Sequence, residues 1–247
     1  MTSANTINET RCLNCNAIVN GNFCSNCGQR KEVSKLTWNS LVYELLHFFS
    51  HIEKSFINTS FKLLIRPEIV IGEYLKGKRI KYFKPLSLFL IWVTIHLLIY
   101  QFTVSIMGYK NLRTDVEVGT YIVKHTALFG LLLFPILSIA LWLIVARSKL
   151  NYIETFIVIL YSFAAVEILI SLQIMIKGLL FRSNFLTNNF PLQVKIVSVI
   201  WALYCFTMLF RHQKIKFLIP RILVCLVIGI LVNTKLTPIV ANLIFKY

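Results

Sequence analysis

The order of apolar and polar residues divides the chain into a polar start and a series of long apolar runs. The runs 85–107 and 126–146 contain no formally charged residue, and the run 155–176 contains one, Glu167. A helix needs about 20 residues to cross a bilayer core of about 30 Å. Each of these three runs is therefore predicted to be a membrane-spanning helix.

Two further apolar runs follow. The run 192–210 carries Lys195 near its start, where a long side chain can extend to the headgroups. The run 217–234 is weaker, because prolines and basic residues flank its short apolar part. It either half-inserts or continues as a helix toward the end of the sequence. We predict an all-α membrane protein whose residues 85–247 form a bundle of four or five transmembrane helices.

A different periodicity precedes the first long run. Between 36 and 65, apolar residues recur at spacings of three and four, which is typical of one face of a helix. The opposite face carries Glu44, His47 and His51, and the two imidazoles either bind a metal or line a wet face. Such an amphipathic helix either lies in the membrane interface or packs on the bundle. A second short helix is predicted over 67–76, because proline suits its first position.

Composition assigns these patterns to a membrane protein. The 247 residues are 57% hydrophobic and 15% charged, with a mean hydropathy of +0.70, whereas soluble chains are about 25% charged. The 26 Lys and Arg outnumber the 10 Asp and Glu, an excess typical of the cytoplasmic loops of membrane proteins. No signal peptide is visible ahead of residue 85. We therefore expect a multi-pass protein with a cytoplasmic N-terminus.

The most basic stretch lies at the end of a juxtamembrane region, residues 35–84. It holds five basic side chains, Lys76, Lys78, Arg79, Lys81 and Lys84. They are candidates for contact with anionic lipid headgroups, each worth about 1 kcal/mol near a charged surface. The alternative is that these residues only fix the topology by staying inside.

The polar head, residues 1–34, carries a doubled Cys-x-x-Cys motif formed by Cys12, Cys15, Cys24 and Cys27. Two such knuckles present four thiolates in the tetrahedral arrangement of a structural zinc ribbon, so Zn²⁺ is the expected cofactor. An iron centre uses the same ligands, and two disulfides are the alternative in an oxidising compartment. With four protein ligands the site is closed, so we expect a structural or docking role for it.

Two titratable residues lie near the centres of predicted spans. These are His96 in the first span and Glu167 in the third, and a charge at that depth costs about 2.5–3.5 kcal/mol. We expect the two side chains to face each other and share a proton. The pair is either a polar staple between helices or a proton relay or ion site. The remaining cysteines, Cys205 and Cys225, are expected to act as small apolar side chains.

Several of these features occur together in one known family. In order, they are Cys27-Gly28-Gln29, the histidine-bearing helix, Arg66-Pro67, Glu73-Tyr74-Leu75, Gly77-Lys78-Arg79, Tyr82 and Pro85. This series resembles a bacterial zinc-ribbon integral membrane family that is catalogued only as a domain of unknown function. The resemblance implies a bacterial inner-membrane location and a helical bundle. It implies no activity.

The sequence shows no catalytic constellation, so no enzyme is predicted. The leading hypothesis is a membrane scaffold or sensor whose cytosolic ribbon docks a protein partner. The alternative is a transporter or channel-like protein that uses His96 and Glu167. A nucleic-acid partner is not expected, because the ribbon has few basic residues and Phe23 is its only aromatic side chain.

Overall fold

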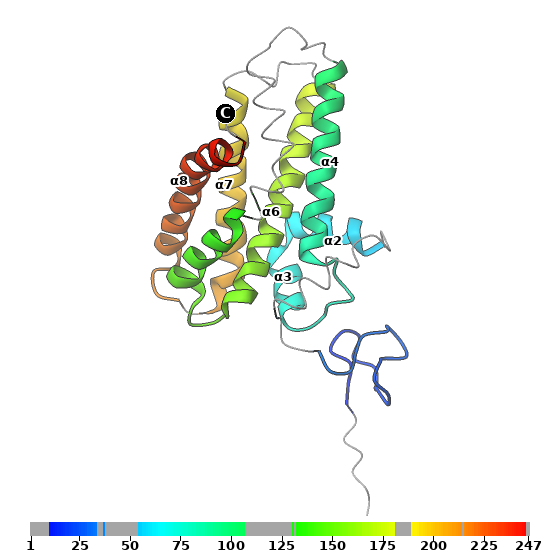
Figure 1. Cartoon of the computed structure of the whole chain (residues 1–247). Helices are drawn as coiled ribbons and strands as arrows, with labels where there is room; N and C mark the ends of the chain where they lie inside the picture. Colours follow the sequence, from blue (N-terminus) through cyan, green and yellow to red (C-terminus); the bar gives the residue numbers. More distant parts are fainter. Residues whose placement is uncertain are drawn as a thin grey trace, which may run out of the picture.

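Helices make up the regular structure of the protein (Figure 1). The computed structural model describes residues 10–33, 37, 54–106, 130, 132–180, 189–213 and 215–245. The α-helices in these ranges include α2 (Lys54–Ile65), α3 (Pro67–Leu75), α4 (Pro85–Ile106), α6 (Tyr152–Ile174), α7 (Asn189–Phe210) and α8 (Leu218–Phe245), and residues 132–141 are α-helical as well. Shorter π-helical and 3-10 segments are η2 (Trp142–Ala146), η3 (Met175–Leu180) and η4 (Arg211–Gln213). The all-α prediction is confirmed.

Three helices are long and apolar enough to cross a membrane. They are Pro85–Thr103 in α4, Tyr152–Gly178 across α6 and η3, and Leu192–Phe210 in α7. They correspond to the first, third and fourth predicted spans, and they make a membrane location plausible.

The other two predicted spans correspond to shorter apolar helices, Leu132–Ala146 and Leu218–Val232. Residues 126–129 of the second predicted span lie outside the described part of the chain. The apolar segment of the fifth run ends at Val232, but the helix that contains it, α8, continues through Pro238 to Phe245, as one of the two predicted alternatives has it.

The bundle is organised around α6, which lies between α4 and α7 (Figure 1). In the apolar segment that could cross a membrane, the buried share is 72% for α6, 44% for α4 and 17% for α7. A helix that is apolar on all sides suits this central position. Phe134, from the helix Leu132–Ala146, packs against Phe89 of α4 and Phe163 of α6, with ring centroids 4.9 and 4.5 Å apart.

A break at Arg66 and Pro67 separates α2 from α3. Pro67 is the first residue of α3, as predicted, and Arg66 has left the helical region with φ −135° and ψ 63°. Steric conflict with the proline ring disfavours the α conformation of the preceding residue. Two short helices at an angle therefore precede the turn that leads into α4 (Figure 1).

The amphipathic helix predicted over 36–65 is described only from Lys54 onward, as α2. Its predicted polar positions Glu44, His47 and His51 lie outside the described residues.

Candidate metal centre

The first Cys-x-x-Cys pair closes a tight turn held by backbone hydrogen bonds. The Cys12 N–H donates to Ala17 O at 2.9 Å, and the Asn16 N–H donates to Cys12 O at 2.9 Å. A β-bridge between Arg11 and Ile18 flanks the turn. Asn16 has a φ of 64°, a left-handed conformation that asparagine adopts more readily than most residues.

The second pair repeats this turn. The Cys24 N–H donates to Gln29 O at 2.8 Å, and the Gly28 N–H donates to Cys24 O at 2.8 Å. A β-bridge between Phe23 and Arg30 flanks it. Gly28 takes the place of the left-handed asparagine with a φ of 73°, where glycine has no steric penalty. The head is therefore built from two copies of one knuckle.

The two knuckles bring the four cysteine sulfurs together. All four Sγ atoms lie within 4.8 Å of one another, with Cys12 Sγ 3.6 Å from Cys27 Sγ and Cys15 Sγ 3.5 Å from Cys24 Sγ. Zn–S bonds of about 2.3 Å in a tetrahedron separate the sulfurs by about 3.8 Å, whereas a disulfide needs about 2.05 Å. The spacing therefore fits a single ion bound by four thiolates, and all four cysteines are free.

The thiols differ in how readily they ionise. The backbone N–H of Ala17 lowers the pKa of the Cys15 thiol to about 6, whereas burial raises the pKa of the Cys27 thiol to about 11. Metal ligands must be thiolates, so protons have to leave the site when an ion binds. Thiolate ligands of this kind suit zinc or iron.

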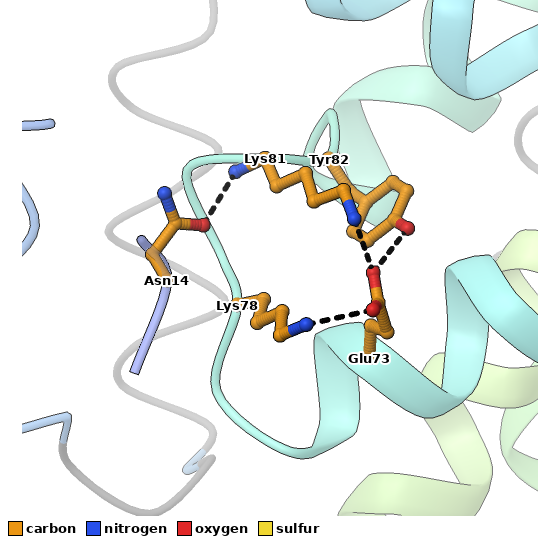
Figure 2. Close-up of polar contacts among 5 residues, drawn as sticks. All are labelled: Asn14, Glu73, Lys78, Lys81 and Tyr82. Carbon is orange, nitrogen blue, oxygen red and sulfur yellow. Dashed lines mark hydrogen bonds and ion pairs between the residues drawn. The ribbon is translucent and has the colours of Figure 1, made fainter. Parts of the chain in front are cut away.

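Both knuckles rest on the turn that follows α3. Gln29 is buried, and its Nε2 donates to Gly77 O at 3.0 Å. The Lys81 backbone N–H donates to Asn14 Oδ1 at 3.1 Å (Figure 2). Leu13 lies directly over Gly77, because a Cβ added there would come within 3.1 Å of Leu13 Cδ1. We call these contacts the seat of the ribbon.

Glu73 holds the same turn from the side of α3 (Figure 2). Its two carboxylate oxygens lie 2.7 Å from Lys78 Nζ and 2.7 Å from Lys81 Nζ. The Tyr82 hydroxyl donates to the carboxylate at 2.5 Å. Lys78, followed by Lys81 and Tyr82, lowers the pKa of Glu73 to about 2, and burial together with Glu73 raises the pKa of Tyr82. Lys81 thus links the two regions, because its backbone contacts the ribbon and its side chain contacts α3.

These contacts change the picture of the basic segment. Lys78 and Lys81 share the carboxylate of Glu73, so part of their charge is offset within the protein. Lys76 and Lys84 are exposed, and Arg79 is half-buried. Of the five residues predicted to face lipid, Lys78 and Lys81 are therefore paired with Glu73, whereas Lys76 and Lys84 are the exposed ones that point outward.

The structure also brings together the two titratable residues predicted to lie near the centres of spans. His96 Nδ1 of α4 lies 2.5 Å from Glu167 Oε2 of α6, and both side chains are buried. The pair therefore joins the two helices that form the core of the bundle. Cys205 and Cys225 are buried as well, as expected for small apolar side chains.

A comparison with protein families gives one match within the chain. A family model described as a protein of unknown function (DUF3667) matches residues 53–97. The matched segment contains α2, α3, the turn and α4 as far as Leu97, which includes His96, and the ribbon lies outside it. No curated protein and no solved structure matches the chain.

Sequence reasoning missed the residues of the seat, Asn14, Gln29 and Gly77, and the role of Glu73. The two knuckles were predicted, because the doubled motif is a local signal and each second cysteine follows an asparagine, Asn14 or Asn26. The partner of Gln29 had no such signal, because 48 residues separate it from Gly77.

Proposed function

We propose that the chain is a membrane scaffold or sensor and that its ribbon docks a cytosolic protein. In this proposal the ribbon holds Zn²⁺ and the N-terminus is cytosolic. The two shorter apolar helices complete a bundle of five spans in a bacterial inner membrane. The proposal assigns no catalytic residue.

The observation that carries the proposal is the exposed apolar surface of the ribbon. Ile18 and Phe23 remain 44% and 56% exposed, although the buried core of the ribbon consists of Val19 and two cysteines. The Arg30 guanidinium lies 5.6 Å from the centroid of the Phe23 ring. Aromatic and arginine side chains are enriched in the hot spots of protein interfaces. A partner that covers Phe23 would remove this apolar surface from water.

The arrangement of the head also supports a docking role, because the metal site and the attachment to the bundle leave the exposed apolar residues accessible. Four thiolates leave no open coordination position, which is typical of structural rather than catalytic metal sites. The seat uses Leu13, Asn14 and Gln29. Ile18 and Phe23 are not among these residues and remain exposed, so a partner can reach them while the ribbon stays attached to the bundle.

The test is site-specific crosslinking from the ribbon in native membranes. A photoreactive amino acid at position 23 should capture one recurrent cytosolic protein, and chelation of the metal should abolish capture. The same amino acid at Ser25, which is exposed but polar, is the matched control. With that protein purified, Phe23→Ala should weaken binding at least about tenfold, as hot-spot residues do, without loss of metal. Equal capture at both positions, or unchanged binding of Phe23→Ala, would show that the docking proposal is wrong.

Transport is a second candidate, favoured by the contact between His96 and Glu167. Ionisable groups inside a membrane bundle are costly and commonly mark ion or proton pathways. The test is proton flux into liposomes that contain the purified protein. Flux that wild type supports and Glu167→Gln abolishes would favour transport, whereas no flux above empty liposomes would assign the pair a structural role.

A further inference from the structure

The exposed side of α2 is apolar, while polar side chains lie on its buried side. Thr59 and Ser60 are 0% and 6% exposed, whereas Ile57 and Phe61 are 73% and 64% exposed. A surface helix of a protein in water shows the opposite pattern, with charged and polar residues outward. The exposed apolar side chains of α2 therefore suit contact with an apolar solvent rather than with water.

The buried polar groups of α2 all have partners in the bundle. Thr59 Oγ1 accepts the Phe83 backbone N–H at 3.0 Å. Ser60 Oγ accepts the Trp92 Nε1–H at 2.9 Å and itself donates to Phe56 O at 2.9 Å. In lipid every polar group must be satisfied within the protein. The described polar side chains of the buried face meet this requirement, and the outward stripe needs no hydrogen bond at all.

The end of α2 is held by a candidate membrane span. The last carbonyls of a helix have no partner within it. In α2, Leu64 O accepts from Trp201 Nε1 at 3.1 Å, and Ile65 O accepts from the Tyr204 hydroxyl at 2.6 Å. Trp201 is the central residue of the apolar segment Leu192–Phe210 of α7. The end of α2 therefore lies within the depth of the bundle rather than below it.

A polar stripe runs beside the apolar one, one residue further along α2. On α2 this stripe consists of Asn58, which is exposed, and Lys62, which is half-buried, and the exposed Arg66 follows directly after the end of the helix. The sequence of α2 contains no acidic residue, so its charged side chains are all basic. Long basic side chains can reach from an apolar surface to the headgroups, and the cytoplasmic leaflet attracts positive charge. The helix thus has one side packed on the bundle, one exposed apolar side and one basic side.

We propose that α2 is embedded in the cytoplasmic leaflet, where the stripe Ile57, Phe61 and Ile65 contacts acyl chains and Lys62 and Arg66 contact the phosphates of anionic phospholipids. The lipid-binding surface of this protein then lies mainly on α2 rather than on the basic turn. This assignment agrees with the pairing of two turn lysines by Glu73. It does not depend on what the ribbon docks.

The first test measures which solvent the apolar stripe meets. An environment-sensitive fluorescent amino acid is placed at position 61, or at position 58 as the matched control, in the full chain. Genetic code expansion is used because the six native cysteines complicate thiol labelling. The protein is reconstituted in vesicles of phosphatidylcholine and phosphatidylglycerol at about 3:1, a mixture that models an anionic leaflet. Brominated acyl chains should quench position 61 several-fold more than position 58, and acrylamide should show the reverse.

Two results would overturn the acyl-chain assignment. Acrylamide quenching at position 61 equal to that at position 58 would place the stripe in water. Protection of position 61 from both quenchers would mean that protein, such as a second copy of the chain, covers the stripe.

The second test addresses the phosphates. Lys62→Gln/Arg66→Gln should weaken retention of phosphatidylglycerol about 30-fold, from two basic residues near a charged surface, as measured by native mass spectrometry. Lys62→Arg/Arg66→Lys should restore it, which separates lost charge from lost fold. The matched control is Lys76→Gln/Lys84→Gln, which removes two exposed charges from the turn. If only this control loses the lipid, or if neither variant does, the assignment to α2 is wrong.

Discussion

The ribbon and the helical bundle hold their folds by opposite means. The buried cluster of the ribbon consists of Cys12, Val19 and Cys24, whereas the buried cluster of the bundle extends from α2 to α8. Apolar burial contributes roughly 25 cal/mol per Å², so a head this small gains little from it. We therefore expect the ribbon to depend on a bound ion, while the bundle depends on packing. The turn between α3 and α4 is where the two regions meet.

Removal of the ion should have the largest effect, because it should unfold the ribbon and leave the bundle folded. In Cys24→Ser/Cys27→Ser the head should unfold, because binding of structural zinc is worth about 10–16 kcal/mol to such a module. Hydrogen exchange should show lost amide protection in residues 10–33 and unchanged protection in α6. Ser25→Ala is the control and should change neither. Protection that persists in the metal-free head would contradict the prediction.

The next largest effect is expected within the bundle, at His96 and Glu167. Replacing either residue by leucine leaves its buried partner unpaired, which costs about 3–5 kcal/mol. The double replacement should cost clearly less than the sum of the two single ones. Unfolding in mixed detergent micelles with rising SDS measures the three values, and the ribbon should keep its metal throughout. Additive costs would show that the two side chains do not interact in the membrane.

A smaller effect is expected where the ribbon meets the bundle. Gly77 has a φ of +100°, and a Cβ there would meet Leu13 at 3.1 Å. Gly77→Val should therefore cost about 1–3 kcal/mol and detach a head that still holds its metal. Faster exchange of the Lys81 amide, with unchanged bound metal, would show this. Gly72→Ala is the control, because nothing lies within 4 Å of its added Cβ.

The smallest effect is expected at Glu73 and depends on pH. The folded pKa of about 2 lies below the ordinary value of 4.5, so ionised Glu73 stabilises the fold. This contribution is full above about pH 4.5 and is lost as pH falls toward about 2. At neutral pH, Glu73→Gln should cost less than about 1 kcal/mol, because solvent screens partly exposed pairs. The difference in stability between wild type and Glu73→Gln, measured by chemical unfolding, should shrink across this pH range. A difference that does not change with pH would exclude the ion pairs as its cause.

The features that the sequence predicts correctly depend on local signals. The spacing of the cysteines is enough to place four thiols in one cluster. Pro67 marks the start of α3, because a proline restricts the residue before it whatever surrounds it. The long apolar runs identify α4, α6 and α7 by length and composition alone.

The features that sequence reasoning missed depend on contacts between distant segments or on the surrounding solvent. Glu73 was not recognised as the partner of Lys78 and Lys81, because a run of basic residues looks the same whether it faces lipid or a carboxylate. The spacing of apolar residues over 36–65 correctly predicts one apolar face on α2, the buried face that carries Phe56. It did not reveal that Ile57 and Phe61 form a second apolar face, because it cannot distinguish a helix in water from one in lipid.

Gln29 has a consequence for how the protein is assembled. Its backbone carbonyl closes the second knuckle, and its side chain holds Gly77. During synthesis the head emerges before Gly77 has been made, and N-terminal units generally fold first. We therefore expect the ribbon to load its ion first and to take its seat only after the following turn has emerged on the same side of the membrane. Attachment of the head would then be a late step of biogenesis that depends on the correct insertion of α4.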